Sequence, residues 1–313
     1  MTKYIIRRLV MMIPVLIGVS LLTFLMLHLA PGDPVDILLG DQATPEAKAN
    51  LRHQLGLDLP LHIQFGRFIV RAVQGDFGRS IHTNQPVLTE IMDRLPYTLE
   101  LTIASMFIAV VLGVGAGVLA AARQNTAVDN VSMVTALLWV SLPSFWFAVI
   151  LQLIFSVNFG WLPLYGRNGG FLTLPWLASL VLPAVTLGAR SAAILARMTR
   201  SSVLEVLRQD YVRTAQAKGL AQKVVLWRHV LKNAFIPVTT VIGLQVGFLL
   251  GGAFITETIF AWPGVGRLGV QAIFSRDIPV VQGMVLLVAT GFVLINLLVD
   301  LVYAWLDPRI RYQ

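Results

Sequence analysis

Six long apolar runs, each long enough to cross a membrane, limit how this chain can fold. A helix needs roughly 20 mostly apolar residues to span the hydrocarbon core of a bilayer. Only 13% of the 313 residues are charged and 56% are hydrophobic, which leaves too few charges to cover a soluble domain. We therefore expect an all-α integral membrane protein with six transmembrane helices. The runs are Leu9–Leu29, Thr98–Ala122, Val134–Val157, Leu177–Met198, Ile236–Thr256 and Met284–Trp305.

The first run, Leu9–Leu29, has the basic flank of a secretory signal peptide, with Lys3, Arg7 and Arg8 before it. However, its apolar part is longer than the ~7–15 residues of a signal core, and no small-x-small cleavage motif follows it. We expect it to be an uncleaved helix that spans the membrane.

The basic residues predict the orientation of these helices. Lys3, Arg7 and Arg8 precede the first run, and positively charged short segments stay on the cytoplasmic side. Alternation then places the linker between the fourth and fifth runs in the cytoplasm, together with both termini. The net charge of +8 thus follows from membrane topology, and we expect no nucleic-acid partner. The basic residues of that linker are Arg200, Arg208, Arg213, Lys218, Lys223, Arg228 and Lys232.

The runs divide the chain into four parts. Residues 1–29 form an N-terminal tail and the first span, and residues 30–96 form an extracytoplasmic loop or cap. Residues 97–306 form a five-helix core that contains the cytoplasmic linker 200–235, and residues 307–313 form a cytoplasmic tail.

The outer segment 30–96 is expected to be a small, mostly helical insertion after the first helix. Thr44 and Pro45 are typical of a helix start, and the helix would continue through Lys48–Leu55. A second, amphipathic stretch follows at Gln64–Val73. Clusters of Pro, Gly and Asp predict turns, and we place them at Pro31-Gly32-Asp33-Pro34 and Gly75-Asp76-Phe77-Gly78.

Glycines spaced four residues apart predict close contacts between the spans. In a membrane, small residues let helices approach one another, because lipid provides no hydrophobic drive between them. Gly113 and Gly117 have this spacing in the second run, and Gly243, Gly247 and Gly251 form a stripe in the fifth. Tight packing and a moving, pore-lining seam both fit this pattern.

Three of the ionisable residues within the spans or near their ends are candidates for a specific role. Glu100 and Asp300 are close enough to the ends of their runs to reach a membrane surface, and we expect them to form structural pairs. Arg190 lies inside the fourth run, where a charge is a candidate functional group by default. It would either meet a substrate carboxylate in an aqueous cavity or extend along the helix toward the membrane surface.

The linker between the fourth and fifth runs carries the most informative soluble sequence. Val203–Lys218 is predicted to be one helix, and Gly219 would end it, because helices often close on a residue with positive φ. A second helix would follow and continue into the fifth run. Two short helices joined by a glycine hinge at the membrane surface form a lever that a soluble partner can move.

This linker resembles the coupling loop of binding-protein-dependent ABC importer permeases. Arg213, Thr214 and Ala215 are followed after three residues by Gly219. The family motif reads Glu-Ala-Ala, three residues, Gly, nine residues, then Ile-x-Leu-Pro. Arg213 and Thr214 stand where the motif has Glu and Ala, and Lys232 stands at the position of its proline. These departures are similar to those of the dipeptide, oligopeptide, glutathione and nickel branch of the family.

Further stretches are similar to the same branch and extend the resemblance over essentially the whole chain. Found in order along one sequence, they are far more specific than any single motif. They are Pro31-Gly32-Asp33-Pro34, Gly75-Asp76-Phe77-Gly78, Met198-Thr199-Arg200-Ser201-Ser202, Thr256-Glu257-Thr258-Ile259-Phe260-Ala261-Trp262-Pro263-Gly264 and Asp307-Pro308-Arg309-Ile310-Arg311.

The resemblance implies the type I ABC importer permease fold and a mechanism shared among several subunits. This chain and a second permease would form the translocation pathway in the cytoplasmic (inner) membrane of a bacterium. One or two kinds of ABC ATPase subunit would bind ATP and Mg²⁺ and dock on the linker. An extracytoplasmic binding protein would deliver a dipeptide or another short peptide to the outer loops.

The resemblance also implies which residues serve these contacts. The outer turn that would receive the binding protein or form an outer gate contains Glu257, Trp262, Pro263 and Gly264. Arg190 is the candidate for the pathway itself. The residues implied in ATPase coupling are Arg213, Thr214, Ala215, Ala217, Lys218, Gly219 and Leu220.

The sequence carries no recognisable catalytic motif. It contains no cysteine, its five histidines are scattered, and the Gly-Lys dipeptide of a P-loop does not occur. We therefore expect no enzyme activity, no metal site and no bound cofactor in this chain, and ATP hydrolysis would take place on partner subunits.

Two other classes of membrane protein fit the sequence less well. A secondary transporter would carry carboxylates at mid-membrane for ion coupling, whereas Arg190 is the central charge here. An intramembrane enzyme would need a nucleophile and a base or metal ligands within its spans, and His28 stands alone near the end of the first run. Within the importer class the substrate stays open between dipeptides, longer peptides, glutathione and nickel chelates.

Overall fold

All regular secondary structure in the part of the chain that the computed structural model describes is helical. The one strand-like feature there is an isolated bridge between Arg79 and Pro86. The predicted all-α class is therefore confirmed. The turn predicted at Pro31–Pro34 and the C-terminal stretch Asp307–Arg311 lie outside the described residues. The description covers all residues except 1, 30–34, 36–38, 40–43 and 307–313.

The helices fall into two compact units. One comprises residues 1–96 and 264–291, and the other comprises residues 97–263 and 292–313. The linker and Arg190 both belong to the second of these units. Most of the residues expected to carry function therefore share one packed body.

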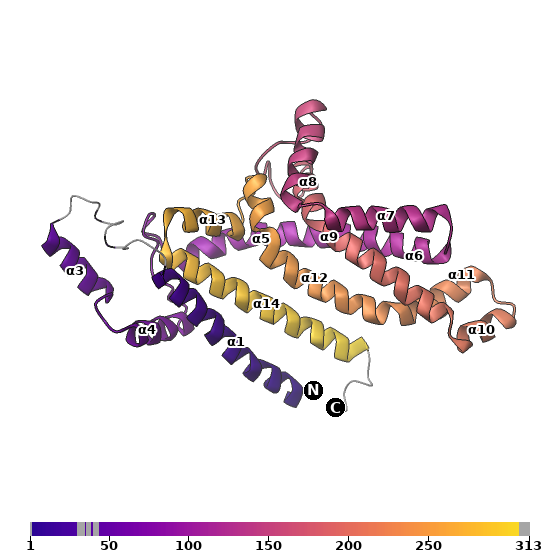
Figure 1. Cartoon of the computed structure of the whole chain (residues 1–313), viewed down its shortest axis with the longest axis horizontal. Coiled ribbons are helices and arrows are strands. Elements are labelled where there is room, and N and C mark those ends of the chain that lie inside the picture. The colour runs from indigo at the N-terminus through magenta and orange to yellow at the C-terminus, as the bar shows by residue number, and fades with distance from the viewer. Residues whose placement is uncertain (1, 30–34, 36–38, 40–43, 307–313) are drawn as a thin grey trace. The chain divides into compact units, whose positions relative to one another are not determined.

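Helix α9 (Leu174–Leu207) is the centre of the second unit (Figure 1). Eighteen of its 34 residues are buried, and most of these are alanine, serine, threonine or leucine. The helix packs against α12 (Leu231–Ile259), α6 (Gly115–Ala122) and α7 (Ala127–Ser141). Small side chains allow several helices to approach the same one closely, so α9 supports all its neighbours.

Two glycines of the second predicted run make very close approaches to α9. A Cβ atom added to Gly113 would lie 2.4 Å from the carbonyl oxygen of Ala192. A Cβ atom added to Gly117 would lie 2.6 Å from the carbonyl oxygen of Ala196. Such distances leave no room for a side chain, and the predicted tight packing is therefore confirmed for this pair.

The glycines of the fifth predicted run differ in how closely they pack against other residues. A Cβ atom added to Gly247 would lie 2.9 Å from the ring of Phe292, so this glycine packs tightly. Gly243 is also buried. By contrast, the Cβ position of Gly251 borders open space. The stripe is therefore a packing surface over part of its length.

Among the described residues, four helical segments are long and apolar enough to cross a membrane. A sharply bent pair of helices in the same part of the chain would make a fifth span if the pair is counted as one. Helix α1 (Thr2–Leu29) corresponds to the first predicted run, and its described apolar part is Val10–Met26. The structure agrees with a multi-pass protein, whereas the number six stays a prediction. The four segments are Val87–Ala122, Leu174–Leu207, Gln222–Gly251 and Ile278–Leu298.

The third predicted run, Val134–Val157, is wrong as a single straight helix. Helix α7 is followed by α8 (Ser144–Leu151) and the π-helix η2 (Gln152–Asn158), and the two halves are bent by 106°. Proline disfavours helical geometry in the residue before it, and Leu142 accordingly has a ψ of 132°. Pro143 is the residue in the sequence that indicates this break.

The two helices predicted in the outer segment are present as α3 (Pro45–Leu55) and α4 (Leu61–Val73). Thr44 caps α3 as expected, because its hydroxyl accepts a hydrogen bond from the Ala47 N–H at 3.3 Å. The turn predicted at Gly75–Gly78 follows α4, and both of its glycines have positive φ (79° and 81°). Local sequence signals therefore predicted this part of the first unit correctly.

A buried carboxylate joins segments of the first unit that are far apart in sequence. Asp277 accepts hydrogen bonds from the Ser80 hydroxyl at 2.5 Å and from the Ile81 N–H at 3.1 Å. It lies between α13 (Val265–Ser275) and α14 (Ile278–Leu306). Because 197 residues separate Ser80 from Asp277, no local pattern predicts this contact.

Candidate functional site

The linker after α9 folds as separate short helices rather than as one long one. The single helix predicted for Val203–Lys218 is wrong, because α9 ends at Leu207 and α10 (Asp210–Ala217) begins after a break. Gln209 has a ψ of 146°, which is extended, and it turns the chain into α10. Figure 1 shows α10 and α11 (Gln222–Val224) beyond the ends of α9 and α12.

Gly219 ends this helical region in the way that the sequence predicted. Its φ is 77°, which an L-residue with a side chain adopts only with strain. Its N–H donates to the carbonyl oxygen of Gln216 at 2.9 Å and closes the turn after Lys218. A Cβ atom added here would meet no atom within 4 Å. The position therefore needs glycine for its backbone conformation and not for lack of space.

Two buried side chains anchor α10 on its surroundings. Val212 is fully buried and Ala215 is 5% exposed. Ala215, expected among the coupling residues, therefore supports α10 from its inner side and is not available to a partner. Both side chains belong to one hydrophobic cluster with residues of α6, α9 and the start of α12. The other buried members are Ala121, Val203, Val225, Val230, Leu231 and Ala234.

A polar contact joins α10 to the helix that enters the fifth run. Nδ2 of Asn233 donates to the Tyr211 hydroxyl oxygen at 2.8 Å and to the His229 carbonyl oxygen at 3.2 Å. Asn233 lies in α12, and α11, the π-helix η3 (Val225–Val230) and α12 form one continuous helix from Gln222 onward. The predicted second helix is thus confirmed. Single π-turns within α-helices are frequent at functional sites.

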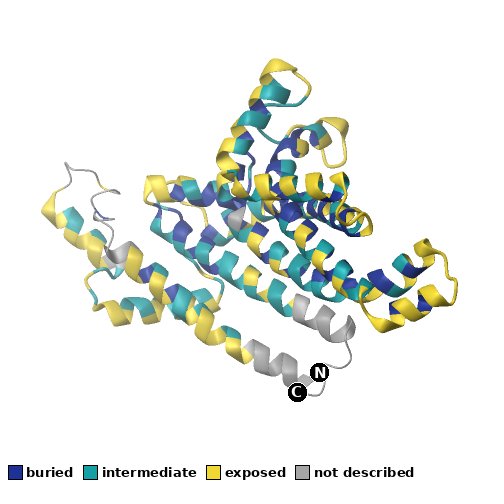
Figure 2. Ribbon diagram, turned by 45° about the vertical axis from the view of Figure 1, so that its right-hand side comes forward, coloured by how far each residue is buried: buried dark blue, intermediate teal, exposed yellow. Residues whose placement is uncertain are grey.

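Much of the ribbon in this region is exposed (Figure 2), and its exposed residues include both basic and apolar ones. Of the residues predicted for ATPase coupling, all except Ala215 are exposed. Sequence reasoning did not single out Trp227, which is 69% exposed, although an exposed tryptophan among basic residues is itself a signal of binding. We call the following exposed residues the linker surface: Tyr211, Arg213, Lys218, Leu220, Val224 and Trp227.

An ion pair fixes α9 shortly before the linker. Nε and Nη2 of Arg200 donate to the two carboxylate oxygens of Asp129 at 2.6 and 2.7 Å. Asp129 is 2% exposed and also accepts the Asn125 N–H at 3.0 Å. Because Asp129 belongs to α7, this pair joins α7 to α9 and holds in place the part of α9 that precedes the linker.

Glu100 forms the structural ion pair that the sequence predicted. Nε and Nη2 of Arg167 donate to its carboxylate oxygens at 2.9 and 3.0 Å, and the Trp176 indole donates to the same carboxylate at 3.1 Å. The Glu100 carboxylate raises the pKa of the Arg167 guanidinium, which therefore stays charged. The second predicted member of this class, Asp300, has a side chain outside the described part of the structure.

Glu100→Ala is expected to lower the free energy of unfolding by about 2–3 kcal/mol, because a half-buried guanidinium and an indole N–H lose their acceptor. Glu100→Gln retains an acceptor oxygen and is the matched control, with a smaller loss expected. Thermal and chemical denaturation of the purified variants in mild detergent measure both. A negligible loss for Glu100→Ala would show that these hydrogen bonds contribute little.

The predicted outer-turn residues lie at and just beyond the end of α12. Trp262 is fully buried, and its Nε1 donates to the Tyr97 carbonyl oxygen at 2.8 Å. Glu257 is also fully buried and accepts the Thr98 hydroxyl at 2.7 Å. Both partners lie in α5 (Val87–Ala109). The side chains of Glu257 and Trp262 thus hold the turn in place and do not point toward a partner.

The rest of this turn is formed by backbone. The Trp262 N–H donates to the Glu257 carbonyl oxygen at 2.8 Å, and Ala261 has a φ of 50°. Pro263 is half-buried and Gly264, which is buried, precedes the first residue of α13. Glu257 and Trp262 therefore close one hydrogen-bonded turn, and Pro263 and Gly264 follow it as the connection to α13.

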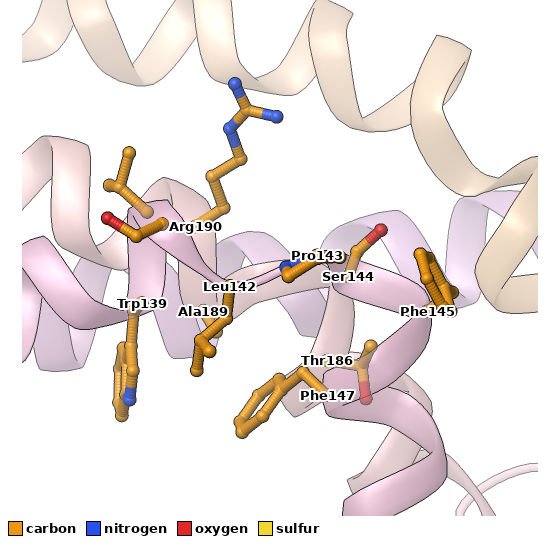
Figure 3. Close-up of a pocket in the computed structure, with 11 residues that line it drawn as sticks. Trp139, Leu142, Pro143, Ser144, Phe145, Phe147, Thr186, Ala189 and Arg190 are labelled. Atoms are coloured by element: carbon orange, nitrogen blue, oxygen red, sulfur yellow. The ribbon is translucent and has the colours of Figure 1, made fainter.

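Arg190 is exposed near the middle of α9 and lines a cavity of 330 Å³ at the bend between α7 and α8 (Figure 3). Its guanidinium carbon lies 5.5 Å from the centre of the Phe248 ring of α12, a cation–π distance. Of the two expectations for this residue, the structure places it in the wall of a cavity. Its part in transport stays a prediction.

Two protein-family models match this chain. Residues 113–312 match the family described as "Binding-protein-dependent transport system inner membrane component". Residues 1–102 match the model described as "Binding-prot-dependent transport system membrane comp, N-term". The first match covers more than half of the chain and includes the whole linker.

Curated relatives align over 100% of this chain and 100% of their own length. The dipeptide transport system permease protein DppB of Alkalihalophilus pseudofirmus is 49% identical over 333 positions. The di/tripeptide transport system permease protein DppB of Pseudomonas aeruginosa is 45% identical over 335 positions. The glutathione transport system permease protein GsiC of Escherichia coli strain K12 is 47% identical over 313 positions.

Solved structures share the fold at low sequence identity. An inward-facing structure of the MetNI methionine ABC transporter matches with a TM-score of 0.60 at 18% identity, covering 70% of this chain and 96% of that chain. An amino acid ABC transporter matches with a TM-score of 0.51 at 15% identity, covering 71% of this chain and 94% of that chain. The likeness shows that the helices adopt the ABC importer permease fold.

Proposed function

Because the chain belongs to the family of binding-protein-dependent transport system inner membrane components, we propose that it imports dipeptides and other short peptides as the permease subunit of an ATP-driven transporter. It is an ABC transporter permease and a multi-pass protein of the inner membrane. The peptide substrate is supported by full-length relatives that are named for dipeptide and di/tripeptide transport. The structural observation that carries the ATP-driven part is the linker surface.

The linker surface has the chemistry of a docking site for a soluble ATPase subunit. Trp227 and Leu220 would be buried on docking, while Arg213 and Lys218 would pair with acidic groups of the partner. Movement of α10 would pass through the buried Val212 to the start of α12, which continues into a candidate span. ATP and Mg²⁺ would be bound and ATP hydrolysed on the partner, and this chain would be non-catalytic.

Further subunits complete the proposed importer. A second permease would form the pathway together with this chain, and one or two kinds of ATPase would dock on the two linkers. An extracytoplasmic binding protein would dock on the side of the outer turn Glu257–Gly264, contacting its neighbours while Glu257 and Trp262 shape it from within. Both chain termini and the linker would be cytoplasmic, which the basic residues of these segments support.

Glutathione is the second candidate substrate. The alignment with the glutathione permease has the same length as this chain, whereas those with the two dipeptide permeases are 20 or more positions longer. Glutathione is itself a short peptide, so one pathway would suit both. The two substrates differ in length and in the number of carboxylates, and competition between them separates the two assignments.

Deletion of this chain is expected to abolish high-affinity uptake of a labelled dipeptide, because no pathway remains for the bound substrate. Reintroduction of the chain restores uptake. Unlabelled dipeptide in excess should then suppress the signal strongly and glutathione weakly. The reverse order of competition would assign the transporter to glutathione, and uptake that is unchanged by the deletion would contradict the proposed function.

The energy source is tested on the same cells. Depletion of ATP with the proton gradient maintained should stop uptake, whereas a protonophore added at constant ATP should have little effect. The opposite pattern would identify an ion-coupled secondary transporter. Purification of the tagged chain in mild detergent should also recover a second permease and one or two P-loop ATPases.

A further inference from the structure

A broken helix pair in the second unit opens onto a cavity. Helices α7 and α8 are bent by 106°, and the residues between them, Leu142 and Pro143, have extended ψ values of 132° and 130°. Irregular backbone at membrane depth is stable where it is buried in protein or lines an aqueous cavity. The cavity of 330 Å³ lies at this break and is lined by both residues, by Ser144 and by Arg190 (Figure 3).

The N-terminus of α8 faces this cavity. Helix α8 begins at Ser144, and the preceding Pro143 offers no side-chain acceptor to its first turn. The first N–H groups of a helix have no partner within it and carry a partial positive charge. Such an end, with the Ser144 hydroxyl as a further donor, is a favourable place for an anion.

Arg190 adds a full positive charge to the same cavity. Arg190 lies well inside α9, far from the two residues of this helix that contact carboxylates. Trp176 is 14 residues before it, about 21 Å along the helix axis, and Arg200 is 10 residues after it, about 15 Å. Trp176 and Arg200 contact the carboxylates of Glu100 and Asp129 respectively. Among the described residues, Arg190 has no carboxylate within ion-pair distance. An ionisable group at such depth is functional by default.

A buried hydroxyl in the cavity wall also lacks a partner. Thr186 lies one turn before Arg190, is 3% exposed, and its hydroxyl oxygen makes no hydrogen bond to any described residue. Ser105 and Thr239 of this unit bond to the carbonyl oxygen four residues earlier, whereas the buried hydroxyls of Thr102 and Thr199 share the missing bond with Thr186. Of these three threonines, Thr186 is the one that lines the cavity. The cavity wall therefore holds one buried hydroxyl with spare hydrogen-bonding capacity.

We propose that this cavity binds a carboxylate of the peptide during its passage through the membrane. Arg190 would pair with the carboxylate, and the first turn of α8 with Ser144 would donate hydrogen bonds to it; Figure 3 shows the Arg190 and Ser144 side chains on the same side of the bend. The residues that line the cavity include no acidic side chain. This assignment rests on the proposed function, because it takes the cargo to be a peptide with a free carboxylate.

The test uses the absence of cysteine from this chain. Arg190→Cys is expected to lower dipeptide uptake by the assembled transporter about 10- to 100-fold, the range for a lost charge-assisted hydrogen bond. Treatment with an ammonium-bearing methanethiosulfonate restores a positive charge at residue 190 and should recover most of the uptake. A sulfonate-bearing reagent and a neutral methyl reagent should recover none. Wild-type transporter treated with each reagent corrects for thiols of the partner subunits.

Arg197→Cys is the matched control, because Arg197 is exposed on the same face of α9, seven residues further on, and does not line the cavity. Its uptake should stay within about twofold of wild type and should not depend on the reagent's charge. The ATPase rate of the Arg190→Cys complex, measured in parallel, should be retained. Should that complex fail to assemble, Arg190→Lys and Arg190→Met make the same comparison, with at least about tenfold more uptake expected for lysine.

Three results would overturn the assignment while leaving the proposed function intact. These are uptake by Arg190→Cys within twofold of wild type, equal rescue by neutral and cationic reagents, and an equally charge-dependent loss at Arg197. A lipid phosphate held by Arg190 would give the first of these results, because peptide uptake would not need the charge. Failure of the proposed function would instead appear as wild-type transporter that takes up no peptide at all.

Discussion

Replacing Gly117 with leucine is expected to leave almost no folded protein in the membrane. A Cβ atom at this position would lie 2.6 Å from both the Ala196 carbonyl oxygen and the Thr199 Cβ of α9. The first of these atoms is backbone and cannot rotate away, so α6 would have to separate from α9. Overpacking that only displaces side chains costs about 1–3 kcal/mol, and a clash with the central helix of the unit should exceed that range.

Gly115→Leu is the matched control, because Gly115 is exposed and a Cβ atom there meets nothing within 4 Å. It adds the same side chain to the same helix, two residues away. Detergent extraction followed by size-exclusion chromatography of the tagged proteins measures the folded fraction. We expect a wild-type profile for Gly115→Leu and aggregate for Gly117→Leu. A normal profile for both would show that α6 and α9 are not in backbone contact.

Local signals account for the parts of the fold that could be predicted from the sequence. The Thr44 cap and the positive φ of Gly219 each act within a few residues of themselves. Each has a physical consequence that does not depend on the rest of the chain. The same holds for the apolar runs, whose length decides that they form helices suited to a bilayer.

The features that the sequence did not predict are of two kinds. Some depend on contacts with distant residues, and one had a local signal that a longer apolar pattern outweighed. The break after Leu207 contains neither glycine nor proline, and it lets Val212 and Ala215 reach a cluster formed by other helices. The bend before Pro143 had a signal, but the apolar run continues across it and favoured one straight span. The contact of Asp277 with Ser80 has no local signal at all.

The candidate site was predicted in part. Arg213 and Lys218 are exposed on the linker that the motif marks, and their role in coupling stays a prediction. Ala215 is buried because the spacing of α10 puts it on the same face as Val212, three residues earlier. The exposure of Trp227 follows from how η3 packs. Sequence alone therefore located the linker but did not divide it into inner and outer faces.

Gly219→Pro is expected to abolish peptide uptake while the protein still inserts and folds. Proline fixes φ near −65°, whereas Gly219 has a φ of 77°. Proline also removes the N–H that bonds to the Gln216 carbonyl oxygen. The end of α10 and the residues up to Leu220 would therefore change course, and the exposed side chains of the linker surface would no longer match an ATPase partner. The buried cluster beneath α10 would stay intact.

Ala221→Pro is the control for this change, because Ala221 has a φ of −58°, is exposed, and directly precedes α11. Proline is compatible with that φ, and the structure gives the Ala221 N–H no acceptor among the described residues. Uptake of labelled dipeptide and recovery of the ATPase subunits with the tagged chain are measured for both variants. We expect near-complete loss of uptake and reduced recovery for Gly219→Pro, and values close to wild type for Ala221→Pro. Full uptake by Gly219→Pro would remove this turn from the coupling mechanism, whereas loss in both variants would show that the linker tolerates no proline and that the positive φ of Gly219 is not the cause.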